Sequence, residues 1–233
     1  MCEKCRCTDG YSLPGLEVRW HMVETDHSQA LPEKDGQQRL FVTSVFGVRE
    51  ASREKRRSIN KRIDKMLEIV EANPIDHFLL WHDLEDERRA IKAALPQATE
   101  VYGTQDLDER EDRIIAFSEG TLQYLATKPV IAGSGCNFQY HCHRAIFLGI
   151  SFKFAEFIQA IHRIFRFLQT EVVTIDLIYS EAEASVRKIL EEKWQRHKHQ
   201  VDAMSRIIRR YGLSHNALAD ESRRTLGVTR QVV

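Results

Sequence analysis

The stretch Phe78-Leu79-Leu80-Trp81 decides the fold that the sequence predicts. Four consecutive apolar residues without polar alternation are typical of a strand buried on both faces, as in a parallel sheet. Residues 84–95 follow with the pattern of a helix, which Pro96 ends. We therefore predict that residues 78–81 form a strand of a parallel sheet.

Strand and helix patterns alternate on both sides of this stretch. A helical apolar stripe precedes it, with Ile59, Ile63 and Val70 on one face. Further strands are expected at 16–21, 99–102, 122–127, 145–150 and 172–179, and helices at 106–118, 154–167 and 181–211. Short alternation of this kind indicates an α/β fold with one sheet of five or more parallel strands, covered by helices on both faces. Ligands of such sheets bind beyond the carboxyl ends of the strands, so we expect chemistry in the loops after Trp81, Tyr102, Thr127 and Ile150.

Composition excludes several classes of protein. The chain has 233 residues, 42% hydrophobic and 29% charged, which is enough for a packed core and excludes a wholly disordered chain. Basic and acidic residues number 34 each, so bulk charge alone would not hold nucleic acid. Residues 49–65 are nevertheless locally basic, and they either contact phosphates or form a solvated face.

Cysteine usage and the chain start predict a cytoplasmic protein without membrane spans. The five cysteines are an odd count, and the first residues lack an apolar signal core. Cys2, Cys5 and Cys7 are close enough in sequence to suggest zinc, but no fourth ligand follows at the required spacing. The alternative is that they belong to a linker, and the sequence leaves this open.

Two segments carry residues suited to binding an anion. In the first, residues 127–137, Gly133 and Gly135 follow an expected strand, so backbone N–H groups could meet a ligand; an ordinary turn is the alternative. In the second, residues 159–169, Arg163 and Arg166 are three apart on an expected apolar helix, with Gln159 one turn earlier. Two such guanidinium groups require a phosphate or carboxylates as partners.

No complete catalytic constellation is present in the sequence. Gly10 and Gly15 have the spacing of a P-loop, but Leu16 and Glu17 stand where Lys and Ser/Thr would bind phosphate and magnesium.

Together, the two segments resemble motifs V and VI of superfamily-two helicases, and the second is similar to the Swi/Snf-type box. Motif VI is matched by Gln159, Arg163, Arg166 and Gln169, whereas Leu168 replaces the usual Gly. Motif V is matched by Thr127, Gly133, Gly135 and Asn137, in a loop about two residues longer than the common form.

Two further segments extend the resemblance to about residues 40–180. Residues 78–82 resemble the motif IV strand, and Tyr102-Gly103-Thr104 resembles the turn that precedes the next helix. The closest type is the phage and mobile-element helicase. The resemblance implies a RecA-like (P-loop NTPase-type) lobe at 49–180, which is the helicase C-terminal lobe. Residues 1–48 would be an irregular extension or linker from a missing first lobe, and residues 181–233 a C-terminal helix and flexible tail.

The resemblance also implies a function, that of the motor lobe of an ATP-dependent DNA helicase or translocase. Arg163 and Arg166 would be catalytic, acting on the γ-phosphate of ATP. Nucleotide binding would involve Gly133, Gly135, Gln159 and Asn137. Contacts to the DNA backbone, without sequence reading, would come from Gly103, Thr104, Thr127 and Lys128.

The implied cofactors are ATP and Mg²⁺, bound mainly by a missing N-terminal RecA-like lobe, which would also be the partner of this chain. Because this chain has no P-loop, we expect little or no ATP hydrolysis by the chain alone.

Two other functions remain open at this stage. One is a non-catalytic nucleic-acid-binding or regulatory module on a degenerate helicase lobe, favoured by Leu168 and the longer loop. The other is a small-molecule enzyme such as a methyltransferase, with cofactor at Gly133 and Gly135, which would leave Arg163 and Arg166 unexplained. Translocation polarity, unwinding, RNA acceptance, oligomeric state and biological process are not indicated by the sequence.

Overall fold

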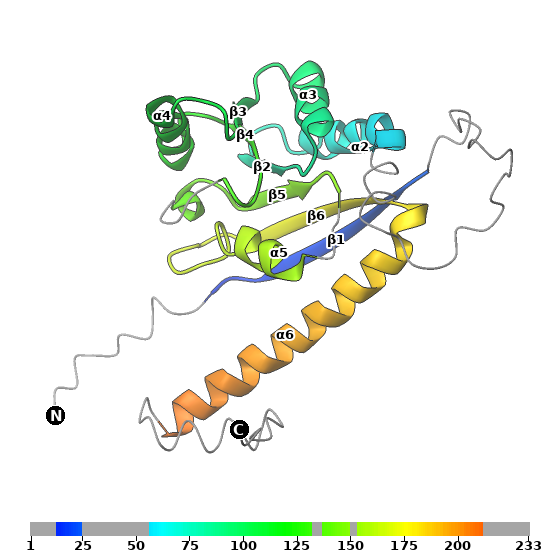
Figure 1. Cartoon of the computed structure of the whole chain (residues 1–233). Helices are drawn as coiled ribbons and strands as arrows, with labels where there is room; N and C mark the ends of the chain where they lie inside the picture. The colour runs from blue at the N-terminus through cyan, green and yellow to red at the C-terminus, as the bar shows by residue number, and fades with distance from the viewer. Residues whose placement is uncertain (1–12, 25–55, 132–136, 150–152, 212–233) are drawn as a thin grey trace, which may run out of the picture. The chain divides into compact units, whose positions relative to one another are not determined.

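The fold is built on one parallel sheet. The computed structural model describes residues 13–24, 56–131, 137–149 and 153–211. The sheet has six strands in the order β1-β6-β5-β2-β4-β3, every neighbouring pair parallel (Figure 1). The strands are β1 Leu16–Val23, β2 Phe78–Trp81, β3 Thr99–Val101, β4 Tyr124–Thr127, β5 Arg144–Phe147 and β6 Val173–Ser180. This confirms the predicted α/β fold and parallel sheet.

Helices of the first unit cover both faces of the sheet, as the alternation predicted. They include α2 Ile59–Glu71, α3 Glu85–Ala94, α4 Leu107–Ser118 and α5 Phe154–Ile161, with short 3-10 helices η2 Phe138–Tyr140 and η3 Glu181–Glu183. The last helix is α6, Ala184–Tyr211. On one face, Met66 of α2 and Ile91 of α3 join the core formed by Phe78 and Leu80. On the other face, the ring of Phe157 in α5 lies 5.3 Å from that of Phe147.

The described part of the N-terminal segment belongs to this sheet. Strand β1, within residues 1–48 where we expected an irregular extension, pairs with β6 over its whole length. His21 of β1 and the buried Asp176 of β6 also approach each other, with Nε2 and Oδ1 2.7 Å apart. The sheet therefore extends beyond the boundary at residue 49 that the resemblance implied.

The chain divides into two compact units, residues 1–186 and 187–233. The second unit contains most of α6, where Arg187 and Glu191 form an ion pair one turn apart at 3.0 Å. Among the described residues, no helix is both long and apolar enough to cross a membrane.

A buried ion pair joins α2 to the strand ends within the first unit. The Arg62 side chain is fully buried, and its Nη2 pairs with the carboxylate of Glu183, which is also fully buried. Its Nε donates to Ser58 Oγ at 2.7 Å, and its Nη1 donates to the carbonyls of Leu148 at 2.7 Å and Ile178 at 2.9 Å. Arg62 lies in the basic stretch 49–65 but is neither solvated nor accessible to a phosphate, because its donors are used inside the fold.

Candidate functional site

Four predicted DNA-binding residues lie together at the carboxyl ends of three neighbouring strands. Thr127, the last residue of β4, is in register with Trp81 of β2 and Val101 of β3. The carboxyl ends of these strands therefore meet, and the segments that follow begin there. Lys128 follows β4, and the turn containing Gly103 and Thr104 follows β3 one residue after its end. We call these four residues, Thr127, Lys128, Gly103 and Thr104, the strand-end site.

The members of the strand-end site differ in accessibility. Gly103 and Thr104 are exposed, and a Cβ added to Gly103 would meet no atom within 4 Å. Lys128 is half-buried. Thr127 is fully buried, and its hydroxyl has no hydrogen-bond partner among the described residues. In this conformation Lys128 and the Gly103-Thr104 turn can meet a phosphodiester, whereas the Thr127 hydroxyl cannot.

The turn after β3 is held by contacts to its neighbours. The amide of Tyr102 donates to Gln105 Oε1 at 2.9 Å. The Arg88 guanidinium lies 4.3 Å from the centre of the Tyr102 ring and forms an ion pair with Glu100 at 2.6 Å. These contacts fix the chain immediately before Gly103 and leave its backbone open to solvent.

His82 belongs to the same edge, and our sequence reasoning assigned it no role. Its amide donates to the Thr127 carbonyl at 3.2 Å, which continues the pairing of β2 with β4. Its side chain is 3% exposed, and neither ring nitrogen has a hydrogen-bond partner in the part of the chain that the structure describes. Burial, reinforced by the positive charge of Lys128, lowers the pKa of His82 to about 4. The only sequence signal was its position directly after the apolar run 78–81.

The two predicted arginines do not lie on a helix. Helix α5 ends at Ile161, so the prediction that it continues to residue 167 is wrong. Residues 162–168, which we call the arginine turn, contain Arg163 and Arg166. The amides of Arg163 and Ile164 donate to the carbonyls three residues back, at 3.3 Å and 3.1 Å, as in a 3-10 turn. The Phe165 amide still donates to the carbonyl four residues back, that of Ile161, at 2.9 Å, so α-helical bonding is interrupted within the turn.

Two residues shape the end of the arginine turn. Gln169 stabilises it through a hydrogen bond, and Leu168 changes the direction of the backbone. Leu168 has φ +70°, the left-handed conformation that favours glycine. This is the position where the resembled motif has Gly. The Gln169 side chain donates to the carbonyl of Ile164 at 3.2 Å, an oxygen that a continued helix would pair with residue 168.

Both arginines are half-buried, and Nε of Arg163 has no hydrogen-bond partner among the described residues. Gln159 is exposed on α5, and Asn137 is exposed just before η2. Gly133 and Gly135, with the loop that would carry them, lie outside the described residues, as do Cys2, Cys5 and Cys7. No group of His, Cys, Asp and Glu suited to a metal occurs in the described ranges.

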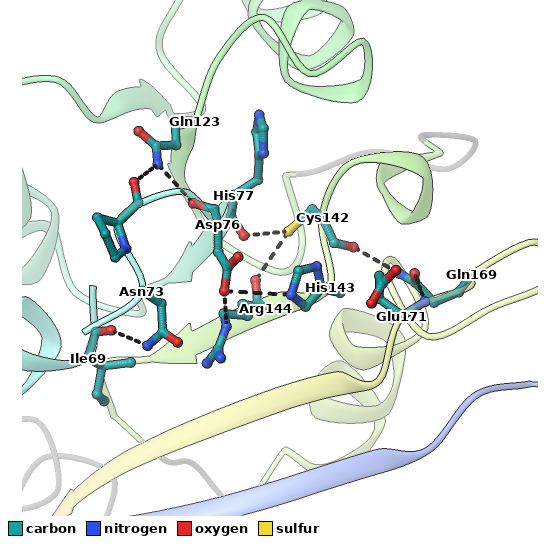
Figure 2. A network of polar contacts seen from close by, with 11 residues as sticks. Ile69, Asn73, Asp76, His77, Gln123, Cys142, His143, Arg144, Gln169 and Glu171 are labelled. Carbon is teal, nitrogen blue, oxygen red and sulfur yellow. Dashed lines mark hydrogen bonds and ion pairs between the residues drawn. The ribbon is translucent and has the colours of Figure 1, made fainter. Parts of the chain in front are cut away.

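A polar network lies at the opposite, amino-terminal edge of the strands (Figure 2). Asp76 accepts a hydrogen bond from Arg144 Nε at 2.5 Å, just before β2 and at the start of β5. The Cys142 thiol donates to the carbonyls of His77 at 3.3 Å and Arg144 at 3.2 Å. Burial raises the pKa of Cys142 to about 12, so the thiol is not a nucleophile at neutral pH. This network is structural.

Comparisons with known proteins found similarity to solved structures alone. No protein-family model matches the chain, and no curated protein matches it. The chain is similar to C-terminal parts of ATPase and DEAD-box proteins among solved structures.

Two of these structures are the C-terminal part of the Fun30 ATPase domain and the C-terminal domain of the DEAD-box protein Dbp5. The first has 17% identity and a TM-score of 0.49 over 55% of this chain and 44% of that one. The second has 15% identity and a TM-score of 0.48 over 58% of this chain and 79% of that one. The chain thus matches less than half the length of the Fun30 structure.

Proposed function

We propose that this chain is the second RecA-like lobe of an ATP-dependent DNA helicase or translocase of the Swi/Snf-like phage type. The observation that carries the proposal is the strand-end site. Gly103-Thr104 and Thr127-Lys128 are distant in sequence, were assigned to DNA from separate motifs, and begin at the same edge of the sheet. The structure therefore leaves these residues close enough to contact one nucleic-acid strand.

In this proposal the strand-end site contacts the backbone of one nucleic-acid strand. Lys128 supplies the positive charge, and the exposed amides of the Gly103-Thr104 turn supply neutral donors. The Thr127 hydroxyl joins them only if its surroundings rearrange, because it is fully buried. Backbone contact of this kind is independent of sequence, as a translocating motor requires.

In this proposal the arginine turn contacts the phosphates of ATP. The Nε of Arg163 lacks a hydrogen-bond partner among the described residues, which fits a phosphate as its missing acceptor. ATP, with Mg²⁺, supplies the phosphoryl group and the divalent charge when bound, mainly to a P-loop lobe. The residues of this chain that would hold it are Arg163, Arg166 and Gln159, where the arginines stabilise developing negative charge and Gln159 couples nucleotide to DNA.

The test of DNA contact uses fluorescence anisotropy of the chain with labelled single-stranded DNA across a salt series. Lys128→Gln should weaken binding several-fold and lower the salt slope by roughly one unit, as expected for one lost phosphate contact. Arg89→Gln is the matched control, since it removes one exposed positive charge from α3. Equal effects of the two substitutions would refute a specific role for Lys128.

The test of the motor role needs this chain joined to a P-loop lobe. There, Arg166→Ala should reduce DNA-stimulated ATP hydrolysis by roughly a thousandfold or more while DNA binding is retained. A second candidate function, a non-catalytic nucleic-acid-binding module, is favoured by Leu168 in the place of the motif's Gly. An unchanged hydrolysis rate for Arg166→Ala, with DNA binding intact, would favour that second function.

A further inference from the structure

The side-chain amide of Gln169 makes four hydrogen bonds at the end of the arginine turn. Its side chain is almost fully buried, and its Nε2 donates to the carbonyls of Ile164 at 3.2 Å and Cys142 at 3.0 Å. Its Oε1 accepts from the amides of Thr170 and Glu171, both at 3.0 Å. Both donor hydrogens and both acceptor sites of the amide are therefore occupied.

These bonds span the segment that carries the arginines. Ile164, fully buried, lies between Arg163 and Arg166, so the bond from Gln169 to its carbonyl fixes the turn at its middle. The amide of Gln169 also donates to the carbonyl of Arg166 at 3.1 Å. The turn is thus tied to Gln169 from both its backbone and its side chain.

The bond to Cys142 connects the arginine turn to a second segment. The Cys142 amide donates to the carbonyl of Phe138 in η2 at 2.9 Å, and the Phe138 ring packs against that of Phe117 at 5.2 Å. Helix η2 begins directly after Asn137, the last residue of the motif V segment. Figure 2 shows the link from Gln169 to Cys142, and from there to His77. A continuous series of hydrogen bonds therefore joins the arginine turn to the end of the segment that follows β4.

We propose that Gln169 is a positioning residue, which sets the arginine turn relative to Cys142 and η2. The inference rests on the proposed function, because it assigns Gln169 a role in presenting Arg163 and Arg166 to phosphate. Since its amide is fully used inside the fold, Gln169 acts through the turn and not by contact with phosphate.

The chemistry of the side chain makes the proposal testable by substitution. Gln169→Met keeps length and removes all four hydrogen bonds. Gln169→Asn keeps the amide but is one methylene shorter, so it can keep only some of these bonds. A graded response, with Asn between Gln and Met, is expected of a positioning residue.

Gln123 provides a matched control in the same region. Its Nε2 donates to the carbonyls of Pro74 at 2.7 Å and Asp76 at 3.1 Å, so it also bridges two backbone oxygens (Figure 2). It is half-buried, and these two bonds join it to the residues before β2 and not to the arginine turn. Gln123→Met therefore removes similar bonds without touching the turn.

The first readout is amide hydrogen exchange of the whole chain. In Gln169→Met the amides of residues 163–168 should exchange at least tenfold faster than in the wild type, while those of β2 and β6 keep their protection. Gln169→Asn should fall between them, and Gln123→Met should leave the turn unchanged. Wild-type exchange of the turn in both Gln169 variants would overturn the proposal.

The second readout is binding of inorganic pyrophosphate, followed by NMR of the arginine Nε–H signals. Wild-type chain should perturb the Arg163 signal, Arg163→Ala should lose binding, and Gln169→Met should bind about tenfold more weakly while Gln123→Met binds normally. Wild-type affinity in Gln169→Met would overturn the positioning role. If Arg163→Ala binds as the wild type does, the proposed role of the arginines fails, and the exchange readout still decides whether Gln169 sets the turn. A Gln169→Met variant that does not fold leaves Gln169→Asn to give the same two readouts.

Discussion

Replacing Arg62 by Met should be the most damaging single substitution at a polar residue of the sheet-bearing unit. The guanidinium is fully buried and makes four hydrogen bonds, to Ser58, Leu148, Ile178 and Glu183. Met has a similar volume and no donors. The substitution therefore leaves the Glu183 carboxylate buried without its counter-charge and two strand-end carbonyls without a donor.

The expected magnitude follows from these losses. Removing one partner of a buried ion pair costs about 3–5 kcal/mol, because the remaining charge is uncompensated. Each unpaired buried carbonyl costs about 1–3 kcal/mol when nothing replaces its donor. The Glu183 Oε2 atom keeps the amide of Ser180 at 2.9 Å, which offsets part of the loss. We expect a loss of about 4 kcal/mol, which is a large share of the ~5–15 kcal/mol typical of a whole domain.

The assay is urea denaturation followed by far-UV circular dichroism, with Arg56→Met as the control. Arg56 is exposed and paired with Asp86 at 2.8 Å, so its replacement should cost less than about 1 kcal/mol. The double variant Arg62→Met, Glu183→Met should be more stable than Arg62→Met alone, since it removes the orphaned charge. A loss below about 1 kcal/mol for Arg62→Met would refute the reasoning.

Three further predictions concern residues that the structure singles out. Lowering the pH from 7 to 5 should cost about 2 kcal/mol of stability through His82, because the imidazole is protonated near pH 6.5 in the unfolded chain but stays neutral down to its pKa of about 4 in the folded one. His82→Gln should remove this loss, measured by denaturation at each pH, and an unchanged pH dependence in the variant would contradict the prediction. Leu168→Gly should be about 1 kcal/mol more stable than Leu168→Ala, the reverse of the usual order, since only glycine adopts φ +70° without strain; the measurement is chemical denaturation of both variants, and an Ala variant at least as stable would count against strain. Gly120→Ala should lower the melting temperature by several degrees, because Gly120 has φ +77° and a Cβ there would lie 2.7 Å from the His141 ring; adding His141→Ala should recover only the part due to the clash, and full recovery would exclude backbone strain.

Most of the sheet could be predicted from the sequence because its strands are short and buried on both faces. The run 78–81 is β2 without error, and 172–179 differs from β6 by one residue at each end. In β2 this burial gives a continuous apolar run, the pattern of a strand inside a parallel sheet. Residues 16–21 were expected as a strand, but their place beside β6 depends on a partner over 150 residues away, which local pattern does not encode.

The end of α5 could not be predicted because a side chain decides it. Residues 154–167 have an apolar helical pattern throughout, and nothing in the spacing stops the helix at Ile161. Beyond Ile161, Gln169 binds the carbonyl of Ile164 and Leu168 adopts a left-handed conformation, and both are incompatible with a helix that continues past residue 167. Leu is not a residue that marks a helix end, so the usual signal of glycine is missing.

His82 was missed for a related reason. Its placement beside Lys128 requires that β2 and β4 be neighbours in the sheet, although β3 separates them in sequence. The grouping of Gly103-Thr104 with Thr127-Lys128 needs the same information. The strands themselves could therefore be predicted from local pattern, and the four residues of the strand-end site from the motifs. Strand order, and with it the place of His82 beside Lys128, could not.

The pairing of β1 with β6 has a consequence for how the chain folds during synthesis. His21 and Asp176, which meet across this pair, are 155 residues apart in sequence. Strand β1 therefore leaves the ribosome long before its only neighbour in the sheet, and it must wait unpaired while the intervening strands assemble. A waiting strand presents unpaired backbone groups to other chains. Slow translation between β1 and β6 should therefore favour aggregation, and a chaperone that covers residues 16–23 should suppress it.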